Sequence, residues 1–445
     1  MKLKEKVKQI KQGKLTAVEN VMQFGKKIED SKHLNIFLTR NEDALEQAKA
    51  IDEKIKKGEK TGKLAGLCVA VKSNICVQGM PASCASHVLE DVTAAYNATV
   101  INKLLAEDVI ILGMVNMDEF ACGGSGETSA FKPTKNPIQE ELIPGGSSSG
   151  SAAAVSASLC DFALGTDTGG SIRNPSSHCA VTGLKPTYAS VSRYGLIDMT
   201  MSLDVIGPIT KYVDDSKLIF NIIKGQDNLD ASSIDSKPEK RDIKTIGLVN
   251  VQDYCQDNIS KLVEDKVKTI AKKKNWQIKT VNLPLEIALE TYYILVYVEF
   301  FSATRKFDSR KYGLDIDKEA GPEVIRRILG GKEISKAEYA GRYYNHALKA
   351  KEYIKQAFNK LFKDVDLLVL PVVPKLPHKL SKKISLEEMY NYDRLTVPAS
   401  LAGLPAIAIP AGKIKEDNLD KPVGLQLIAP HHQEDMLFKA GEQFE

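Results

Sequence analysis

Two clusters of glycine and serine are the part of the chain best suited to chemistry. They occupy residues 145–151 (G-G-S-S-S-G-S) and 165–171 (G-T-D-T-G-G-S) and flank a small-residue segment, 152–160, that predicts a short helix. Because glycine tolerates backbone angles that turn N–H groups inward, such clusters can form a concave nest of donors for negative charge. The sequence therefore predicts two walls of one site.

The surrounding residues indicate which negative charge this nest would bind. Neither cluster has the lysine of a phosphate-binding P-loop, and no G-x-G-x-x-G follows a plausible strand. In the second cluster Thr168, Gly169 and Gly170 lead directly into Ser171, so backbone donors and a nucleophile share one short turn. This order favours an oxyanion hole that serves attack by Ser171 on a carbonyl carbon.

A serine hydroxyl needs a base to take its proton. None of the seven histidines stands in an evident Ser/His/Asp pattern, and Ser–Lys arrangements are the known alternative. The apolar run 67–71 (L-C-V-A-V) predicts a buried strand with Lys72 at its end. Burial would lower the pKa of this amine from ~10.4 toward ~7–8, so Lys72 is the candidate base.

Each of these features also has a purely structural interpretation. The first cluster could be a flexible linker, Ser171 a helix N-cap, and Lys72 a surface residue that closes a strand. Residues 146–150 also fit G-x-S-x-G, which would make Ser148 the nucleophile of an α/β-hydrolase. That hypothesis is disfavoured because Pro144 and its neighbour interrupt the strand that must run into the serine.

Two charged residues beside the second cluster are expected to shape it. Asp167 precedes the turn 168–171, and we expect its carboxylate to hydrogen-bond that turn. Arg173 follows Ser171, and we expect it to pin the loop through a carboxylate. Neither residue is predicted to be catalytic.

The elements that position these residues follow from the hydrophobic pattern. From residue 66 onward apolar runs alternate with helical patterns, which predicts an α/β fold with a large mixed β-sheet covered by helices on both faces. We expect a single interrupted domain at 61–445 with a more variable insertion at about 226–335. Residues 1–60, with Thr16 as an N-cap, predict helices that wrap the outside of the core.

Later segments carry predictions of their own. The polar, proline-broken segment 225–242 predicts a linker. Residues 337–362 predict one helix whose aromatic residues belong mostly to the core. Buried strands are predicted at 365–370, 406–409 and 425–428, where they would complete the sheet begun before the linker.

Composition limits the possible partners. A net charge of +4 from 61 basic and 57 acidic residues is too balanced for a dedicated nucleic-acid surface, so another chain is expected to do most of any binding to nucleic acid. No stretch has the length and apolarity of a membrane span or a signal peptide, which favours a cytoplasmic location. Seven cysteines at irregular spacing predict buried thiols, with no disulfide framework or metal site.

The sequence resembles the amidase signature family, and within it the A subunits of tRNA-dependent amidotransferases. The resemblance runs from about residue 66 to the C-terminus. The stretches that carry it are N-M-D-E-F-A-C-G-G-S-G-E-T-S (116–129), G-L-K-P-T-Y-A-S-V-S-R-Y-G-L (183–196), S-L-D-V-I-G-P-I-T (202–210) and L-A-G-L-P-A-I-A-I-P (401–410). It implies a nucleophile at Ser171, a bridging serine in a cis peptide at Ser147, and the base at Lys72.

The resemblance also implies an activity and a set of partners. Glutamine would be hydrolysed to glutamate and ammonia, and the ammonia would pass to a B subunit that activates misacylated Glu-tRNA(Gln) or Asp-tRNA(Asn) with ATP and magnesium. A small C subunit would complete the heterotrimer, while this chain itself would need no cofactor or metal. A free-standing amidase of the same family and a scaffold subunit with little catalysis are the alternatives.

Several positions depart from the family's pattern or match it only locally. Ser73 stands where an aspartate usually follows the lysine, and His178 stands where A subunits tend to have tyrosine. Tyr312 matches a tyrosine thought to approach glutamine. The arginine and aspartate expected to hold the amino-acid end of glutamine fall at Lys351 and Gln433, so those two roles are not assigned to them.

Overall fold

One mixed β-sheet forms the centre of the computed structural model, which describes residues 1–235 and 241–445. Within these residues the sheet has eleven strands, in the order β1-β3-β2-β4-β6-β5-β10-β11-β9-β7-β8. They are β1 (Phe37–Arg40), β2 (Cys68–Lys72), β3 (Ile110–Val115), β4 (Phe162–Asp167), β5 (Thr182–Lys185), β6 (Val205–Thr210), β7 (Thr245–Val249), β8 (Gln277–Val281), β9 (Leu367–Pro371), β10 (Ala406–Glu416) and β11 (Leu419–Ile428).

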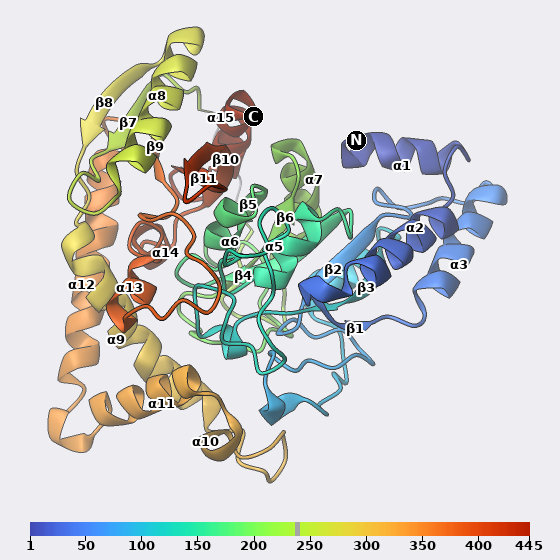
Figure 1. The fold of residues 1–445 in the computed structure, drawn as a ribbon, viewed down its shortest axis with the longest axis horizontal. Helices are drawn as coiled ribbons and strands as arrows, with labels where there is room; N and C mark the ends of the chain where they lie inside the picture. The colour runs from blue at the N-terminus through green and yellow to red at the C-terminus, as the bar shows by residue number, and fades with distance from the viewer. Residues whose placement is uncertain (236–240) are drawn as a thin grey trace.

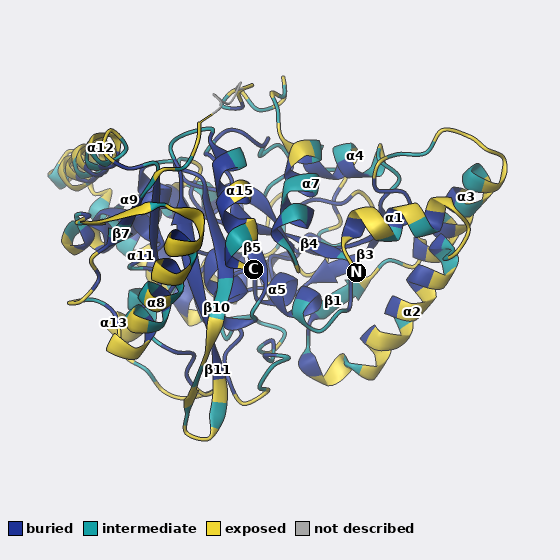
Figure 2. Cartoon of the chain, turned by 90° about the horizontal axis from the view of Figure 1, so that it is seen from above, coloured by how far each residue is buried: buried dark blue, intermediate teal, exposed yellow. Residues whose placement is uncertain are grey.

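The central strands are buried on both faces. In β2, Val69 and Val71 belong to one hydrophobic cluster, whereas Cys68 and Ala70 belong to another. Successive side chains of a strand point to opposite faces, so each face of the sheet has its own core. Figure 2 shows the resulting buried centre with exposed residues on the peripheral helices. The predicted fold class, a large mixed sheet covered by helices on both faces, is confirmed.

Helices surround the sheet, and Figure 1 shows α1 to α3 at one end of the molecule and α9, α11 and α12 at the other. The helices are α1 (Leu3–Lys11), α2 (Ala17–Asp30), α3 (Ala44–Lys56), α4 (Thr99–Leu105), α5 (Ser149–Ser156), α6 (Arg173–His178), α7 (Val213–Ile223), α8 (Asp257–Lys274), α9 (Leu285–Thr304), α10 (Ile316–Glu319), α11 (Pro322–Ile334), α12 (Arg342–Leu361), α13 (Leu386–Asn391), α14 (Val397–Leu401) and α15 (Glu434–Phe444). In the described part of the chain, none of them is both long and apolar enough to cross a membrane.

The N-terminal segment is helical as predicted but also contributes a strand. Thr16 caps α2 through a capping box with Glu19, in which each side chain accepts a hydrogen bond from the other residue's backbone N–H. The prediction of helices alone is wrong for β1, which pairs antiparallel with β3 at one edge of the sheet. Four residues are too few to show a recognisable alternation of apolar side chains. The division of the chain at residue 60 stays a prediction.

The later elements agree with the predictions in type and differ in extent. β9, β10 and β11 join the sheet begun before residue 225, as predicted. β10 is longer than predicted because it continues past Pro410 and pairs with β11 as far as Glu416. Of the predicted linker 225–242, residues 236–240 lie outside the described residues.

The single helix predicted at 337–362 is wrong in its first turn. A short 3-10 turn precedes α12, and Gly341 between them has a φ of +71°. A residue in the left-handed region ends one helix before the next begins. The core assignment of the aromatic residues holds for Phe358, which is fully buried, but Tyr353 is 59% exposed.

Candidate active site

Two parallel strands bring the predicted base and the predicted nucleophile to one edge of the sheet. β2 ends at Lys72, and β4, its parallel neighbour, ends immediately before the turn 168–171. Because neighbouring parallel strands end at the same edge, the lysine and the glycine-rich turn lie close together. Helix α5 begins beside them at Ser149, directly after the first glycine and serine cluster.

The amine of Lys72 lies in a cage of hydroxyl groups. Its Nζ is 2.7 Å from Ser147 Oγ, 2.9 Å from Ser148 Oγ and 2.8 Å from Thr166 Oγ1. Lys72 is fully buried, and no carboxylate lies within ion-pair distance of it in the described part of the chain. A buried ammonium without such a partner is disfavoured, so the cage suits an uncharged amine.

The hydrogen bonds of the cage indicate which oxygens the two N–H groups and the lone pair of a neutral Lys72 amine would contact. Ser148 Oγ donates to the carbonyl of Thr166 at 3.0 Å, so it accepts from Lys72. Thr166 Oγ1 also receives the amide of Asn74 at 3.3 Å. If the two N–H groups of the amine go to these two oxygens, its lone pair is left for the hydroxyl proton of Ser147.

The pKa of Lys72 agrees with this arrangement. Burial, which penalises the charged amine, lowers its pKa to about 7, although the carboxylates of Asp118, Asp167 and Asp204 oppose the shift. A substantial fraction of the molecules therefore carries an uncharged amine at neutral pH, as a general base requires.

The two serine-containing loops are joined through the backbone. The N–H of Ser148 donates to the carbonyl of Ser171 at 3.0 Å. The peptide bond between Gly146 and Ser147 is cis, as the family resemblance implies. Ser147 is fully buried, whereas Ser171 keeps 6% of its surface exposed. Ser171 is therefore the member of the group that a substrate could reach.

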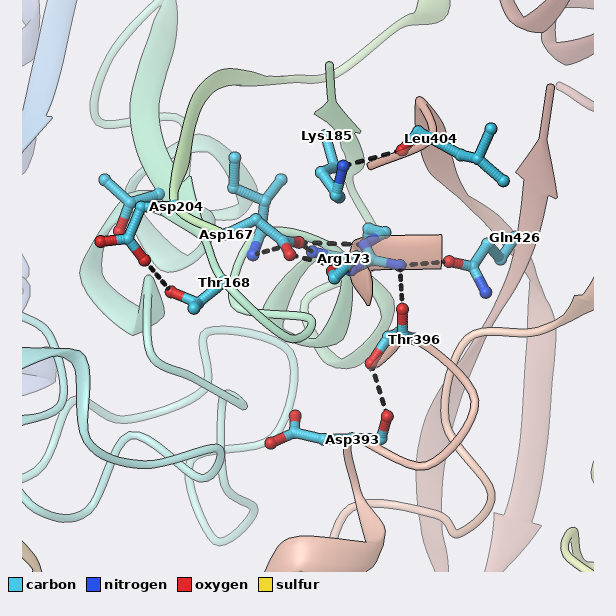
Figure 3. A network of polar contacts seen from close by, with 12 residues as sticks. Asp167, Thr168, Arg173, Lys185, Asp204, Asp393, Thr396, Leu404 and Gln426 are labelled. Atoms are coloured by element: carbon cyan, nitrogen blue, oxygen red, sulfur yellow. Dashed lines mark hydrogen bonds and ion pairs between the residues drawn. The ribbon is translucent and has the colours of Figure 1, made fainter. Parts of the chain in front are cut away.

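A buried ion pair holds the turn that carries Ser171 (Figure 3). Arg173 contacts Asp167 through Nε at 3.0 Å and through a terminal nitrogen at 2.8 Å, and both side chains are completely buried. Asp167 also accepts the backbone N–H of Ile172 at 3.1 Å. Burial alone would raise the pKa of the Asp167 carboxyl, but the guanidinium lowers it below its ordinary value. The structural roles predicted for Asp167 and Arg173 are confirmed.

The other end of Arg173 reaches the C-terminal part of the sheet. Its NH1 group donates to Gln426 Oε1 at 2.6 Å and to the carbonyl of Thr396 at 2.8 Å, as Figure 3 shows. One guanidinium thus connects the turn of the predicted nucleophile, residues 168–171, with β11 and with the start of α14. Such fixed contacts keep a catalytic turn in one shape.

The predicted oxyanion donors lie in this turn. Thr168 is anchored through its hydroxyl, which donates to Asp204 Oδ1 at 2.6 Å. Within the described residues the backbone N–H groups of Gly169 and Gly170 form no hydrogen bond with the protein. A Cβ on Gly170 would overlap Thr396 Oγ1, so only glycine fits there. The two glycines of the turn therefore offer free donors beside Ser171.

No pattern in the sequence singled out a second group of charged residues that lies beside the turn. Asp393, which follows α13, is buried, and a Cβ on Gly170 would lie 3.3 Å from its Oδ1. Tyr293 donates to Asp393 Oδ2 at 3.3 Å, and the guanidinium of Arg327 lies 5.5 Å from the centre of the Tyr293 ring. Burial raises the pKa of Asp393 to about 7. Asp393 thus lies beside the turn of the predicted nucleophile, and Arg327, whose Nε donates to Glu323 Oε1 at 3.0 Å, lies over the tyrosine ring that contacts Asp393.

The three residues that the family resemblance placed near the substrate lie in three other segments of the chain. Tyr312 is 47% exposed beside Lys311, and no hydrogen bond or ring contact joins it to the nucleophile turn in the described chain. Lys351, on α12, donates to the carbonyl of Ser202 at 3.2 Å. Gln433 stands at the start of α15. The structure therefore brings Asp393 to the turn, with Arg327 over the ring of Tyr293 that contacts Asp393, and not the pair at which the family resemblance pointed.

Two departures from the family pattern are buried. Ser73 follows Lys72, and its hydroxyl has no hydrogen-bond partner among the described residues. His178 is fully buried, and burial lowers its pKa to about 3, so its ring is uncharged at neutral pH. All seven cysteines are buried, which agrees with the expectation that most of them would be.

Comparison with known proteins gives consistent relatives. A family model described as Amidase matches residues 19–438. The A subunit of glutamyl-tRNA(Gln) amidotransferase from Methanocaldococcus jannaschii is 49% identical, over 96% of this chain and 99% of the relative. The protein of the same name from Methanothermobacter thermautotrophicus is 46% identical, over 99% of this chain and 98% of the relative.

Solved structures agree with this result. The crystal structure of the glutamyl-tRNA(Gln) amidotransferase A subunit from Thermotoga maritima is 34% identical, with a TM-score of 0.79, and covers 96% of this chain and 90% of that one. Peptide amidase from Stenotrophomonas maltophilia shares the fold, with a TM-score of 0.82 at 24% identity, and covers 100% of this chain and 96% of that one.

Proposed function

The chain belongs to the amidase family, and from this premise we propose that it is the glutamine-hydrolysing subunit of a tRNA-dependent amidotransferase. The relatives that share nearly its whole length are named as A subunits of such an enzyme. The observation that most directly supports the chemistry is the fully buried amine of Lys72, which is held by three hydroxyls, with Ser147 at 2.7 Å.

In the proposed reaction Lys72 and Ser147 together deprotonate the nucleophile. The neutral amine of Lys72 accepts the hydroxyl proton of Ser147, which in turn takes the proton of Ser171. The Oγ of Ser171 forms a bond to the carboxamide carbon of glutamine. The carbonyl oxygen becomes an oxyanion, and the free N–H groups of Gly169 and Gly170, together with Thr168, are the proposed donors to it.

The intermediate then collapses and releases ammonia. The relay returns a proton to the departing nitrogen, the C–N bond breaks, and an ester joins the glutamyl group to Ser171. Water, deprotonated by the same relay, attacks the ester carbon. The bond between that carbon and Ser171 Oγ then breaks, the relay returns the proton to Ser171 Oγ, and glutamate is freed. The net reaction consumes one glutamine and one water and yields one glutamate and one ammonia, and Lys72 ends as the neutral amine.

Arg327 and Asp393 are proposed to hold the amino-acid end of glutamine. Free glutamine carries an α-carboxylate and an α-ammonium, which the guanidinium of Arg327 and the carboxylate of Asp393 would complement. The bound ammonium would itself favour the charged form of Asp393, whose pKa burial raises to about 7. Asp393 lies against the turn at Gly170, while Arg327 lies over the ring of Tyr293. This recognition would distinguish glutamine from simple amides. The role of Tyr312 at the substrate stays a prediction.

The partners follow from the proposed role. Ammonia made at Ser171 would serve a B subunit that activates the misacylated Glu-tRNA(Gln) or Asp-tRNA(Asn) with ATP and magnesium, and a small C subunit would join the two. Transfer RNA would then be bound mainly through the complex, because this chain has a net charge of only +4. A cytoplasmic location, where aminoacyl-tRNA is used, is part of the proposal.

One assay tests this function against its alternatives. Ammonia release from glutamine is measured for the purified chain with and without the B and C subunits, beside Ser171→Ala. Ser149→Ala is the control, because Ser149 lies in the same cluster but its Oγ donates to Thr134. Partner-dependent release that only Ser171→Ala abolishes supports the proposal. Partner-independent turnover of other amides would indicate a free-standing amidase, and no turnover at all would indicate a scaffold.

A further inference from the structure

Asp118 touches the loop that holds Ser147 and has no assigned role. It follows β3 and is completely buried. Its backbone N–H donates to the carbonyl of Ser147 at 3.1 Å. Its carboxylate accepts the N–H of Gly126 at 3.1 Å and both the N–H and the hydroxyl of Thr128, at 3.1 and 2.9 Å. One residue therefore ties the 126–128 segment to the loop of Ser147.

The side chain of Asp118 also packs against the residue before Ser147. A Cβ on Gly146 would overlap Asp118 Oδ2, so glycine is needed for the close approach of the carboxylate. The loop is thus fixed from two sides, by a hydrogen bond to the carbonyl of Ser147 and by packing on Gly146. A displacement of Asp118 would move the Ser147 hydroxyl away from Lys72.

The charge of Asp118 acts on the same amine. The titratable groups that face Lys72 are the carboxylates of Asp118, Asp167 and Asp204 and the thiol of Cys84. Asp167 is paired with Arg173, which offsets its charge. Burial raises the pKa of Asp204 to about 6, so it loses charge on the acid side of neutrality.

Asp118 differs from these neighbours in its contacts. In the described chain it has no ion-pair partner, and its oxygens receive only neutral donors. Its electrostatic effect on the Lys72 amine is the largest among these four groups and favours the protonated form. The carboxylate therefore partly offsets the effect of burial on Lys72.

We propose that Asp118 is a positioning residue of the relay: it holds Ser147 at the amine of Lys72 and supplies the negative charge that balances that amine's burial. The inference rests on the proposed function, because it assumes that Lys72 is the base. It assigns Asp118 a role that a purely structural residue would not have, since loss of its charge changes the acidity of another group.

The test compares charge removal at Asp118 with charge removal at its neighbour. Asp118→Asn keeps the shape but places an amide N–H opposite a backbone N–H, so Asp118→Ser is made as a second variant that avoids this conflict. The matched control is Glu119→Gln. Glu119 is also buried and accepts hydrogen bonds from Ser86 Oγ and Gly321 N, but it is not among the groups that face Lys72.

Ammonia release by the complete amidotransferase is measured against pH, with thermal unfolding as a check that each variant is folded. In the Asp118 variants the acid limb of the profile, where activity decreases as the pH falls, is expected to move to lower pH by roughly one unit. Loss of a nearby opposite charge lowers the pKa of Lys72 by about that much. The plateau kcat is expected to fall by at least about 10-fold, with a change in KM below about 3-fold. In the control, Glu119→Gln, the decrease of activity at low pH is expected at the same pH as in the wild type.

The outcomes separate this inference from the proposed function. A folded Asp118 variant whose acid limb stays at the wild-type position, whatever its plateau, overturns the inference and leaves Asp118 a structural residue. A wild-type complex that releases no ammonia from glutamine, or does so equally well as Ser171→Ala, overturns the proposed function instead.

Discussion

Lys72 and Ser147 lie together at the end of β2, with Nζ of the lysine 2.7 Å from Oγ of the serine. The two other oxygens that contact the amine belong to Ser148 and Thr166. Since the Ser148 hydroxyl donates to a backbone carbonyl, its proton is committed to that bond. Ser147 is therefore the hydroxyl best placed to give a proton to Lys72, and the predictions below follow from this arrangement.

Substitution of Ser148 distinguishes the relay from an α/β-hydrolase elbow. Ser148→Ala removes one acceptor of Lys72 but leaves the proposed nucleophile, so ammonia release is expected to fall by roughly 10- to 100-fold without being abolished. A fluorophosphonate probe, which reacts with activated serines, should still label this variant and should fail to label Ser171→Ala. Loss of labelling in Ser148→Ala, with labelling kept in Ser171→Ala, would instead favour Ser148 as the nucleophile of an α/β-hydrolase.

Addition of a methyl group at Gly170 should disable the nucleophile turn. The new Cβ would overlap Thr396 Oγ1 and press on Asp393, so Gly170→Ala must move the turn that carries the proposed oxyanion donors. We expect kcat to fall by about 10²-fold or more, the cost of losing one such donor. Gly25→Ala is the control, because Gly25 lies in α2 and its Cβ would meet only the end of the Arg40 side chain. Equal activities of the two variants would argue against a role of this turn in catalysis.

Charge removal at the second group should weaken glutamine binding. Arg327→Gln and Asp393→Asn are each expected to raise KM for glutamine by at least about 10-fold, because each leaves one charged end of the substrate without its partner. Arg326→Gln, beside Arg327 on α11, and Lys351→Met, on α12, are the controls and should change KM by less than about 3-fold. Steady-state kinetics of ammonia release measures these effects. A larger effect at Lys351 than at Arg327 would favour the pair at which the family resemblance pointed.

The ion pair between Arg173 and Asp167 should be important for folding. Arg173→Gln leaves the buried carboxylate of Asp167 without its guanidinium, which is expected to lower the free energy of unfolding by about 3–5 kcal/mol. Arg305→Gln breaks an exposed ion pair with Asp317 and should cost less than about 1 kcal/mol. Urea denaturation of both variants measures the difference, and similar values would mean that the buried pair contributes little.

The pattern of the sequence predicted the parts of the site that are local. Lys72 ends an apolar run and Ser171 follows a glycine-rich turn, so residue type and spacing identified these two residues, whereas Ser147 was identified from the family resemblance. The parallel pairing of β2 and β4 then explains why these segments meet at one edge of the sheet. The buried strands were predictable for the same reason, because continuous apolar runs mark them.

The parts that depend on long-range packing were not predictable. Arg327 belongs to a helix with charged neighbours, and its sequence gives no sign that its guanidinium is buried against Tyr293. Asp393 becomes significant only because it approaches Gly170, more than two hundred positions earlier in the chain. Asp118 was visible only as part of a longer motif, since its role depends on a contact with Gly146.

The pH dependence of kcat/KM for glutamine, measured on the complete complex beside Lys72→Met, tests the central claim most directly. Protonation of Lys72 as the pH falls removes the base, so activity should decrease below an apparent pKa of about 7. A folded Lys72→Met variant should lose roughly 10³-fold or more of the activity at every pH. A profile without an acid limb near neutrality, or a Lys72→Met variant of nearly wild-type activity, would contradict the assignment of Lys72 as the base.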